Sequence, residues 1–94
     1  MKSYLLSQNF PNPFNPSTVI HYELPANGFV TLKIFDELGQ EISTLVNRYQ
    51  NTGIYDVNFN AADLASGVYI YRLSVKPFNG GGGFVSTKKL ILLK

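Results

Sequence analysis

The sequence GVYIYRLSV, residues 67–75, carries the clearest fold signal in the chain. The side chains of Tyr69, Tyr71 and Leu73 recur at every second position, which is the period of a β-strand. Aromatic and β-branched residues also favour the pleated backbone of a sheet. We therefore predict a strand over this whole segment.

The same period of two extends outward through nearly the whole chain, and helix signals are almost absent. Polar connections separate the strands, with a loop expected over residues 47–53 and a flexible hairpin tip over residues 80–83. A parallel sheet would need crossover helices, for which the sequence has no room. About seven short strands therefore predict an all-β fold, an antiparallel immunoglobulin-like β-sandwich. The expected strands are residues 4–10, 18–24, 30–35, 41–46, 55–59, 67–75 and 84–93.

Two glycines mark expected turns between these strands. Gly28 ends the turn-forming residues 25–28, and as a glycine it is able to take a positive φ angle. Gly39 follows residues 36–38 and suits the left-handed position of a short hairpin loop.

Residues 9–18, NFPNPFNPST, are unusual because they contain three prolines. Each proline fixes φ and removes a backbone donor, and each pushes the residue before it toward an extended conformation. We expect a rigid, extended lead-in that joins the first edge strand to the second, since proline blocks pairing at sheet edges. Phe10 and Phe14 are expected to anchor this segment to the sandwich.

The segment DLASGVY, residues 63–69, resembles the tyrosine corner of sandwich folds. In such a corner a Tyr at the start of a late strand bonds an upstream backbone group through its hydroxyl. Tyr69 is therefore expected to be structural, with Gly67 supplying a tight approach. Loss of the Tyr71 hydroxyl is expected to cost less, if that hydroxyl reaches solvent.

Composition limits what the chain can be. Its 94 residues suffice for a single domain, residues 1–94, without a second core. The absence of Cys excludes a thiol nucleophile, and a single His argues against a zinc site. No apolar run approaches the roughly 18 residues of a membrane helix. We expect no cofactor, no nucleic-acid partner and no membrane span.

Charge is unevenly distributed along the chain, although its net value is only +2. Residues 1–63 carry three basic and six acidic residues, whereas residues 64–94 carry five basic residues and no acid. Two interpretations stay open. The basic segment could meet an acidic partner, or its lysines could block edge-to-edge aggregation of the terminal strand.

No group of residues has the spacing of a catalytic or ion-binding site. The polar residues between Asp56 and Asp63 faintly resemble a calcium loop, but the Gly and Glu that such a loop needs are absent. The glycines at residues 80–83 lack the Lys-Ser/Thr pair and the helix of a phosphate loop. His21 has no triad signature around it. We therefore expect no enzymatic activity.

Four segments together resemble the C-terminal sorting domains of the type IX (Por) secretion system. Their order and spacing match that family over nearly the whole chain, and the glycines at residues 80–83 depart from it. The family is similar in fold to the immunoglobulin-like domain of flagellar hook-capping proteins. The segments are QNFPNPFNPST (8–18), VTLKIFDELGQEISTLV (30–46), LASGVYIYRL (64–73) and TKKLILLK (87–94).

The resemblance implies a C-terminal signal for secretion and cell-surface sorting, joined to N-terminal cargo domains of the same polypeptide. It implies export to the periplasm and then reading by the outer-membrane secretion machinery, the type IX translocon. The protein is accordingly expected to be secreted or to lie on the cell surface. The residues expected to take part in recognition are Gly67, Tyr69, Tyr71, Lys88, Lys89 and Lys94.

Two other non-catalytic functions stay open. A carbohydrate-binding module could present exposed rings to a sugar, although the chain has no Trp. A structural spacer, like the hook-capping domain, would need no binding site. The rings available for a carbohydrate are Tyr4, Tyr49, Phe78 and Phe84.

Overall fold

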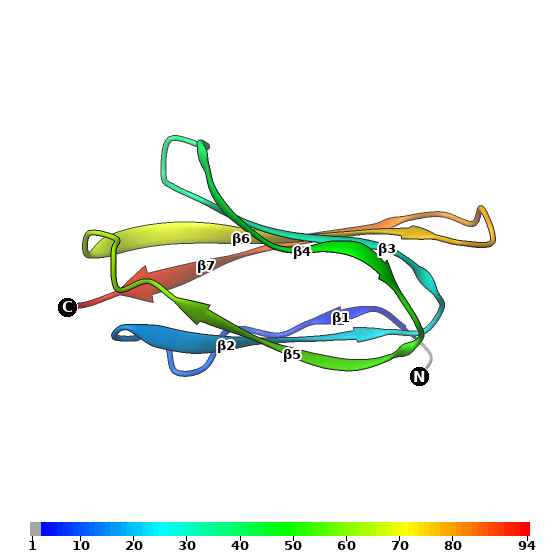
Figure 1. Ribbon diagram of the computed structural model, residues 1–94, viewed down its shortest axis with the longest axis horizontal. Coiled ribbons are helices and arrows are strands. Elements are labelled where there is room, and N and C mark those ends of the chain that lie inside the picture. Colours follow the sequence, from blue (N-terminus) through cyan, green and yellow to red (C-terminus); the bar gives the residue numbers. More distant parts are fainter. Residues whose placement is uncertain (1–2) are drawn as a thin grey trace.

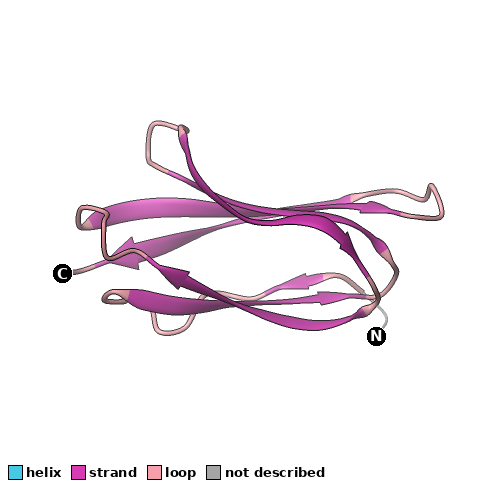
Figure 2. Ribbon diagram, in the orientation of Figure 1, coloured by secondary structure: helices cyan, strands magenta, loops and turns pink. Residues whose placement is uncertain are grey.

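Seven strands form two sheets that lie face to face (Figure 1). The computed structural model describes residues 3–94, so Met1 and Lys2 of the predicted single domain lie outside the described residues. Figure 2 shows only strands and loops over residues 3–94, without a helix. The predicted all-β sandwich is therefore confirmed. The strands are β1 (Leu5–Leu6), β2 (Ser17–Leu24), β3 (Gly28–Phe35), β4 (Glu41–Gln50), β5 (Gly53–Asn60), β6 (Gly67–Pro77) and β7 (Phe84–Leu92).

All pairs of neighbouring strands are antiparallel. The smaller sheet has the order β1-β2-β5, and the larger sheet has the order β4-β3-β6-β7. The chain changes sheet between β2 and β3, between β4 and β5, and between β5 and β6. These crossings leave the last strand, β7, at an edge of the larger sheet.

The core lies between the sheets and is built from alternate residues of each strand. On β2 the side chains of Ile20, Tyr22 and Leu24 are fully buried, and on β6 those of Tyr71 and Leu73 are too. Successive side chains of a strand point to opposite faces, so the period of two in the sequence becomes two apolar inner faces. Burying one large aliphatic side chain contributes about 1.5–3 kcal/mol, which holds the two sheets together.

Two strands differ most in length from the sequence prediction. β4 continues to Gln50 and β5 begins at Gly53, so the loop expected over residues 47–53 is wrong except at residues 51–52. Residues 47–50 are polar because β4 is an exposed edge strand, but β3 pairs with them as far as Gln50. The strand expected over residues 4–10 is reduced to β1 and an isolated bridge at Phe10. Pairing with a neighbouring strand decides these lengths more than side-chain polarity does.

The two turn glycines are required for different physical reasons. Gly39 has a φ angle of 84°, in the left-handed region, as predicted for the hairpin between β3 and β4. Gly28 does not use the positive φ angle that glycine allows. A Cβ atom at Gly28 would lie 2.7 Å from the carbonyl oxygen of Lys76. Glycine is needed at Gly28 because β6 approaches β3 closely there.

One of the two aromatic anchors expected in the proline-rich segment is confirmed. Phe14 is 2% exposed, and its ring lies 6.2 Å from that of Phe59 between the sheets. Phe10 is 74% exposed, so the anchoring expected of its side chain is wrong. The backbone of Phe10 instead pairs with Val19 on β2, which turns its ring toward solvent.

A buried hydroxyl joins the larger sheet to the segment that leads into β2. Tyr71 on β6 is fully buried, so its hydroxyl does not reach solvent. This hydroxyl donates to the carbonyl oxygen of Ser7 at 2.6 Å and accepts from the N–H of Asn9 at 2.9 Å. Burial disfavours the phenolate and raises the pKa of Tyr71 to about 12. Tyr71 thus fixes the position of residues 7–9.

Tyr71→Phe is expected to destabilise the fold more than Tyr69→Phe. Without its hydroxyl, Tyr71 leaves the buried N–H of Asn9 unpaired, at about 1–3 kcal/mol, and the part-buried carbonyl oxygen of Ser7 as well. The Tyr69 hydroxyl has one partner, the carbonyl oxygen of Ala65, in an exposed connection that water can reach. Urea unfolding of the two variants measures the difference. An equal or larger loss for Tyr69→Phe would contradict the assignment.

Candidate functional site

The six residues predicted to take part in recognition lie together on β6, on β7 and just beyond β7. In the register of these two strands, Gly67 is opposite Leu92, and Tyr71 is opposite Lys88. Lys89 is opposite Ile70 in the same ladder. Residues far apart in the sequence therefore meet along one edge of the larger sheet, which includes the C-terminal strand.

Only part of this group is accessible to a partner. Tyr69 is 8% exposed and Tyr71 is fully buried, so both are structural residues of the folded domain. Lys89 and Lys94 are exposed, and Lys88 is half-buried. Of the six residues, the two tyrosines are therefore not accessible in the folded state, whereas the three lysines are.

The predicted tyrosine corner is present. The Tyr69 hydroxyl donates to the carbonyl oxygen of Ala65 at 2.6 Å, four residues upstream. The tight approach predicted for Gly67 is wrong, because a Cβ atom there would meet no atom within 4 Å. The connection between β5 and β6 is held at a second point by Lys94. Its backbone N–H donates to the Ser66 hydroxyl, and its Nζ donates to the carbonyl oxygen of Ala62.

The proline-rich segment covers the C-terminal half of the β7 edge. Asn12 Oδ1 accepts the N–H of Ile91 at 2.9 Å. The N–H of Phe14 donates to the carbonyl oxygen of Ile91 at 2.9 Å, and the N–H of Leu93 donates to that of Phe14 at 3.0 Å. Gln8 Nε2 donates to the carbonyl oxygen of Lys89 at 2.6 Å. Sequence reasoning expected a lead-in between edge strands and missed this cover, since no local pattern links residues 8–14 to residues 89–93.

The N-terminal half of the β7 edge has no such cover. The backbone groups of Lys89, Ile91 and Leu93 bond residues 8–14 and not β6. The N–H and C=O groups of the odd-numbered residues of β7 therefore point away from β6. Because backbone groups alternate along an antiparallel strand, those of Val85 and Thr87 also face outward. Among residues 3–94, no hydrogen bond to these two residues from outside the β6–β7 ladder is found. Their side chains are exposed as well, so the edge is open there.

In the fold, acidic and basic side chains are unevenly distributed between the outer face of the smaller sheet and that of the larger sheet. His21 on the smaller sheet bonds Glu23 at 2.9 Å and Asp56 at 2.7 Å, and these hydrogen bonds raise the pKa of His21. Both ring nitrogens are thereby used, and residues 3–94 contain no group of three or more side chains arranged to hold a metal ion. The alternation of the strands places Lys33, Arg72, Lys76 and Lys89 on the outer face of the larger sheet.

Comparison with known proteins identifies the family. The family model described as "Secretion system C-terminal sorting domain" matches residues 8–92. The chain belongs to the type IX secretion C-terminal sorting domain family. This sorting domain has no match among curated proteins. A structure titled "The crystal structure of CopC from Methylosinus trichosporium OB3b" is similar at a TM-score of 0.58, with 14% identity over 96% of this chain and 93% of that chain. That likeness shows the fold alone.

Membership of this family confirms several expectations of the sequence analysis. The domain serves as a C-terminal sorting signal in type IX secretion, and its protein passes through the periplasm to the cell surface or the extracellular space. It is associated with the secretion machinery and with cargo in the same chain. No helix in residues 3–94 is long and apolar enough to cross a membrane. The relation to hook-capping proteins stays a prediction.

Asn12→Ala is expected to loosen the C-terminal half of β7 without unfolding the sorting domain. The N–H of Ile91 loses its acceptor, whereas the pairing of β7 with β6 is untouched. Amide hydrogen exchange should accelerate at Ile91 by about tenfold, the effect of one lost hydrogen bond of about 1 kcal/mol or slightly more. The amide of Leu73 in the β6 core is the internal control. Unchanged exchange at Ile91 would show that the proline-rich segment does not hold this strand.

Proposed function

We propose that the type IX outer-membrane translocon reads this sorting domain at the open half of β7 and the basic residues beside it. The observation that carries the proposal is that β7 is an edge strand covered over only half of its length. A partner strand can add to unpaired backbone donors and acceptors of this kind, which supplies affinity without a deep pocket.

The exposed basic residues near this edge would orient a partner that approaches β7. Lys89 lies next to the open segment on the outer face, and Arg72 lies opposite Thr87 in the ladder. The Arg72 guanidinium lies 4.5 Å from the centre of the Phe35 ring, which holds it against the sheet. An acidic partner surface would be steered to these charges. Of the two interpretations of the basic C-terminal segment, this proposal adopts the acidic partner.

The open half of β7 lies at the end of the sandwich where cargo would be joined. The start of the described chain and Lys94 lie at opposite ends of the long axis, whose extent is 42 Å (Figure 1). Cargo joined at the N-terminal end would therefore lie away from Lys94 and close to the open half of β7, since the Tyr4 ring stacks on that of Phe84 with their centres 4.9 Å apart. We infer that the domain itself performs no catalysis and acts by binding alone.

Lys89→Glu is expected to reduce export of a reporter that carries a signal peptide and residues 1–94 at its C-terminus. The charge at the proposed surface is reversed, while the melting temperature should stay unchanged because Lys89 is exposed. Arg48→Glu is the matched control, since it makes the same charge change at an exposed position on β4, the other edge of the same sheet. Equal export of the two variants would argue against reading at β7.

Thr87→Pro is expected to block strand addition and to trap the reporter in the periplasm. Proline removes the outward N–H of Thr87, and a proline is tolerated at a sheet edge where that N–H faces solvent. Thr87→Val keeps the backbone N–H and is the control for loss of the hydroxyl. Melting temperatures of the purified variants exclude unfolding as the cause. Normal export of folded Thr87→Pro would refute strand addition and favour a structural spacer.

A further inference from the structure

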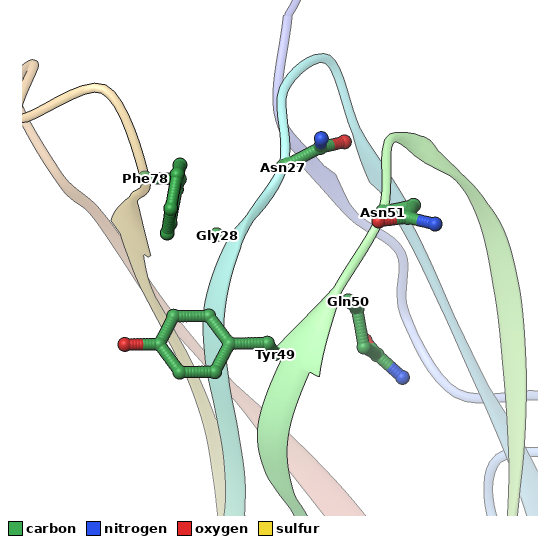
Figure 3. A pocket seen from close by; sticks show the side chains of 6 residues that line it. All are labelled: Asn27, Gly28, Tyr49, Gln50, Asn51 and Phe78. Atoms are coloured by element: carbon green, nitrogen blue, oxygen red, sulfur yellow. The ribbon is translucent and has the colours of Figure 1, made fainter.

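Three connections meet at the end of the sandwich opposite Lys94 and enclose a pocket (Figure 3). They are the turn before β3, the turn after β4 and the start of the β6–β7 hairpin. The pocket has a volume of about 230 Å³. A second hollow beside it shares the rings of Tyr49 and Phe78. The residues that line the pocket are Asn27, Gly28, Tyr49, Gln50, Asn51 and Phe78.

Two exposed rings form the apolar side of the pocket. Tyr49 is 66% exposed and Phe78 is 76% exposed. Their ring centres are 6.2 Å apart, and the planes meet at 82°, which makes a corner. Phe29 supports Tyr49 from β3 with its ring centre 4.9 Å away. Figure 3 shows the Tyr49 ring extending across β3 below Gly28 toward the side of Phe78. The rings are fixed in place although they contribute little to the core.

Asn27 holds the three connections together. Its backbone carbonyl oxygen accepts the N–H of Phe78 at 2.9 Å, and its Oδ1 accepts the N–H of Thr52 at 2.8 Å. The close approach of β6 at Gly28 forms the floor between them. A ligand would therefore meet a preformed site and would not have to order these loops on binding.

Neutral amide groups form the polar side of the pocket. Gln50 is only 9% exposed, and its Oε1 accepts the Tyr22 hydroxyl at 2.5 Å. With their oxygens engaged, Gln50 Nε2 and Asn27 Nδ2 keep N–H groups that no other group in residues 3–94 accepts. Neither nitrogen is an unpaired atom sealed from solvent. No charged side chain lines this pocket.

We propose that this pocket binds a neutral saccharide through a pyranose ring. The C–H groups of a pyranose carry partial positive charge and suit the negative faces of aromatic rings. Its hydroxyl groups can accept hydrogen bonds from the amide of Asn27, which is exposed. An uncharged, amide-lined hollow has no group that would select an acidic ligand.

The site lies at the opposite end of the sandwich from Lys94 and does not depend on the proposed reading of β7. The pocket lies beside β4 and the open strand β7 is the other edge of the larger sheet, so a glycan in the pocket would leave β7 accessible. Variants of the pocket are accordingly expected to leave export of the reporter unchanged, so the two proposals can fail separately.

The test is a titration of the 94-residue chain, followed by amide NMR spectra, with cellohexaose, maltoheptaose and mannohexaose. At least one of these neutral probes should shift the resonances of Gly28, Gln50 and Asn51 at concentrations below about 10 mM, as expected for millimolar or tighter affinity. Polygalacturonate serves as the acidic probe. Shifts caused by polygalacturonate alone, or no shift with any neutral probe, would overturn the proposal.

Phe78→Ala should weaken binding of the active probe by about tenfold or more, equivalent to about 1.4 kcal/mol. Phe10→Ala is the matched control, because Phe10 is 74% exposed but lies outside the pocket. Asn27→Asp keeps the acceptor for Thr52 and removes the amide donor, so it should weaken binding with the loops still in place. Unchanged melting temperatures establish that each variant is folded. Equal weakening by Phe10→Ala would overturn the assignment to this pocket.

Discussion

The arrangement of this sorting domain depends on the two hydrogen bonds that the buried Tyr71 hydroxyl makes. This hydroxyl lies in the interior, where an unpaired polar group is costly, and its two partners are backbone groups of residues 7–9. Asn9 is itself 2% exposed and bonds Pro11 and Thr18 through its side chain. A chain of satisfied hydrogen bonds therefore runs from β6 into the proline-rich segment, and every buried side-chain polar atom in residues 3–94 has a partner.

The position of the proline-rich segment decides how much of the C-terminal strand is exposed. Once residues 7–9 are fixed, Asn12 and Phe14 lie against Ile91 and close one half of the β7 edge. Open edges promote aggregation, so folded proteins usually cover or shorten them. Here the cover ends before Thr87, and a short open stretch remains. Because only part of the β7 edge is covered, the domain can be stable and still have backbone groups to which a partner strand could bind.

The two ends and the two faces of the sandwich have different chemistry. The outer face of the larger sheet is basic, whereas His21 on the smaller sheet is enclosed by two carboxylates. The end that holds Lys94 is tied by hydrogen bonds to the connection between β5 and β6. The opposite end presents aromatic rings and neutral amides around Gly28. A small domain of this kind can support separate contacts because the pocket lies beside β4, whereas β7 is the opposite edge of the larger sheet.

The sequence by itself determined the features that depend on neighbouring residues. Its period of two gave the strands and the inner faces, DLASGVY gave the tyrosine corner, and Gly39 gave a left-handed turn. Four separated segments were sufficient to indicate the family. Only the tertiary structure decided that β4 continues to Gln50, that Tyr71 bonds residues 7–9, and that Asn12 covers β7. It also decided that Gly28 serves a close approach of β6. Each of these depends on a contact between residues more than 20 positions apart, and no local pattern in the sequence records which distant backbone group will lie opposite.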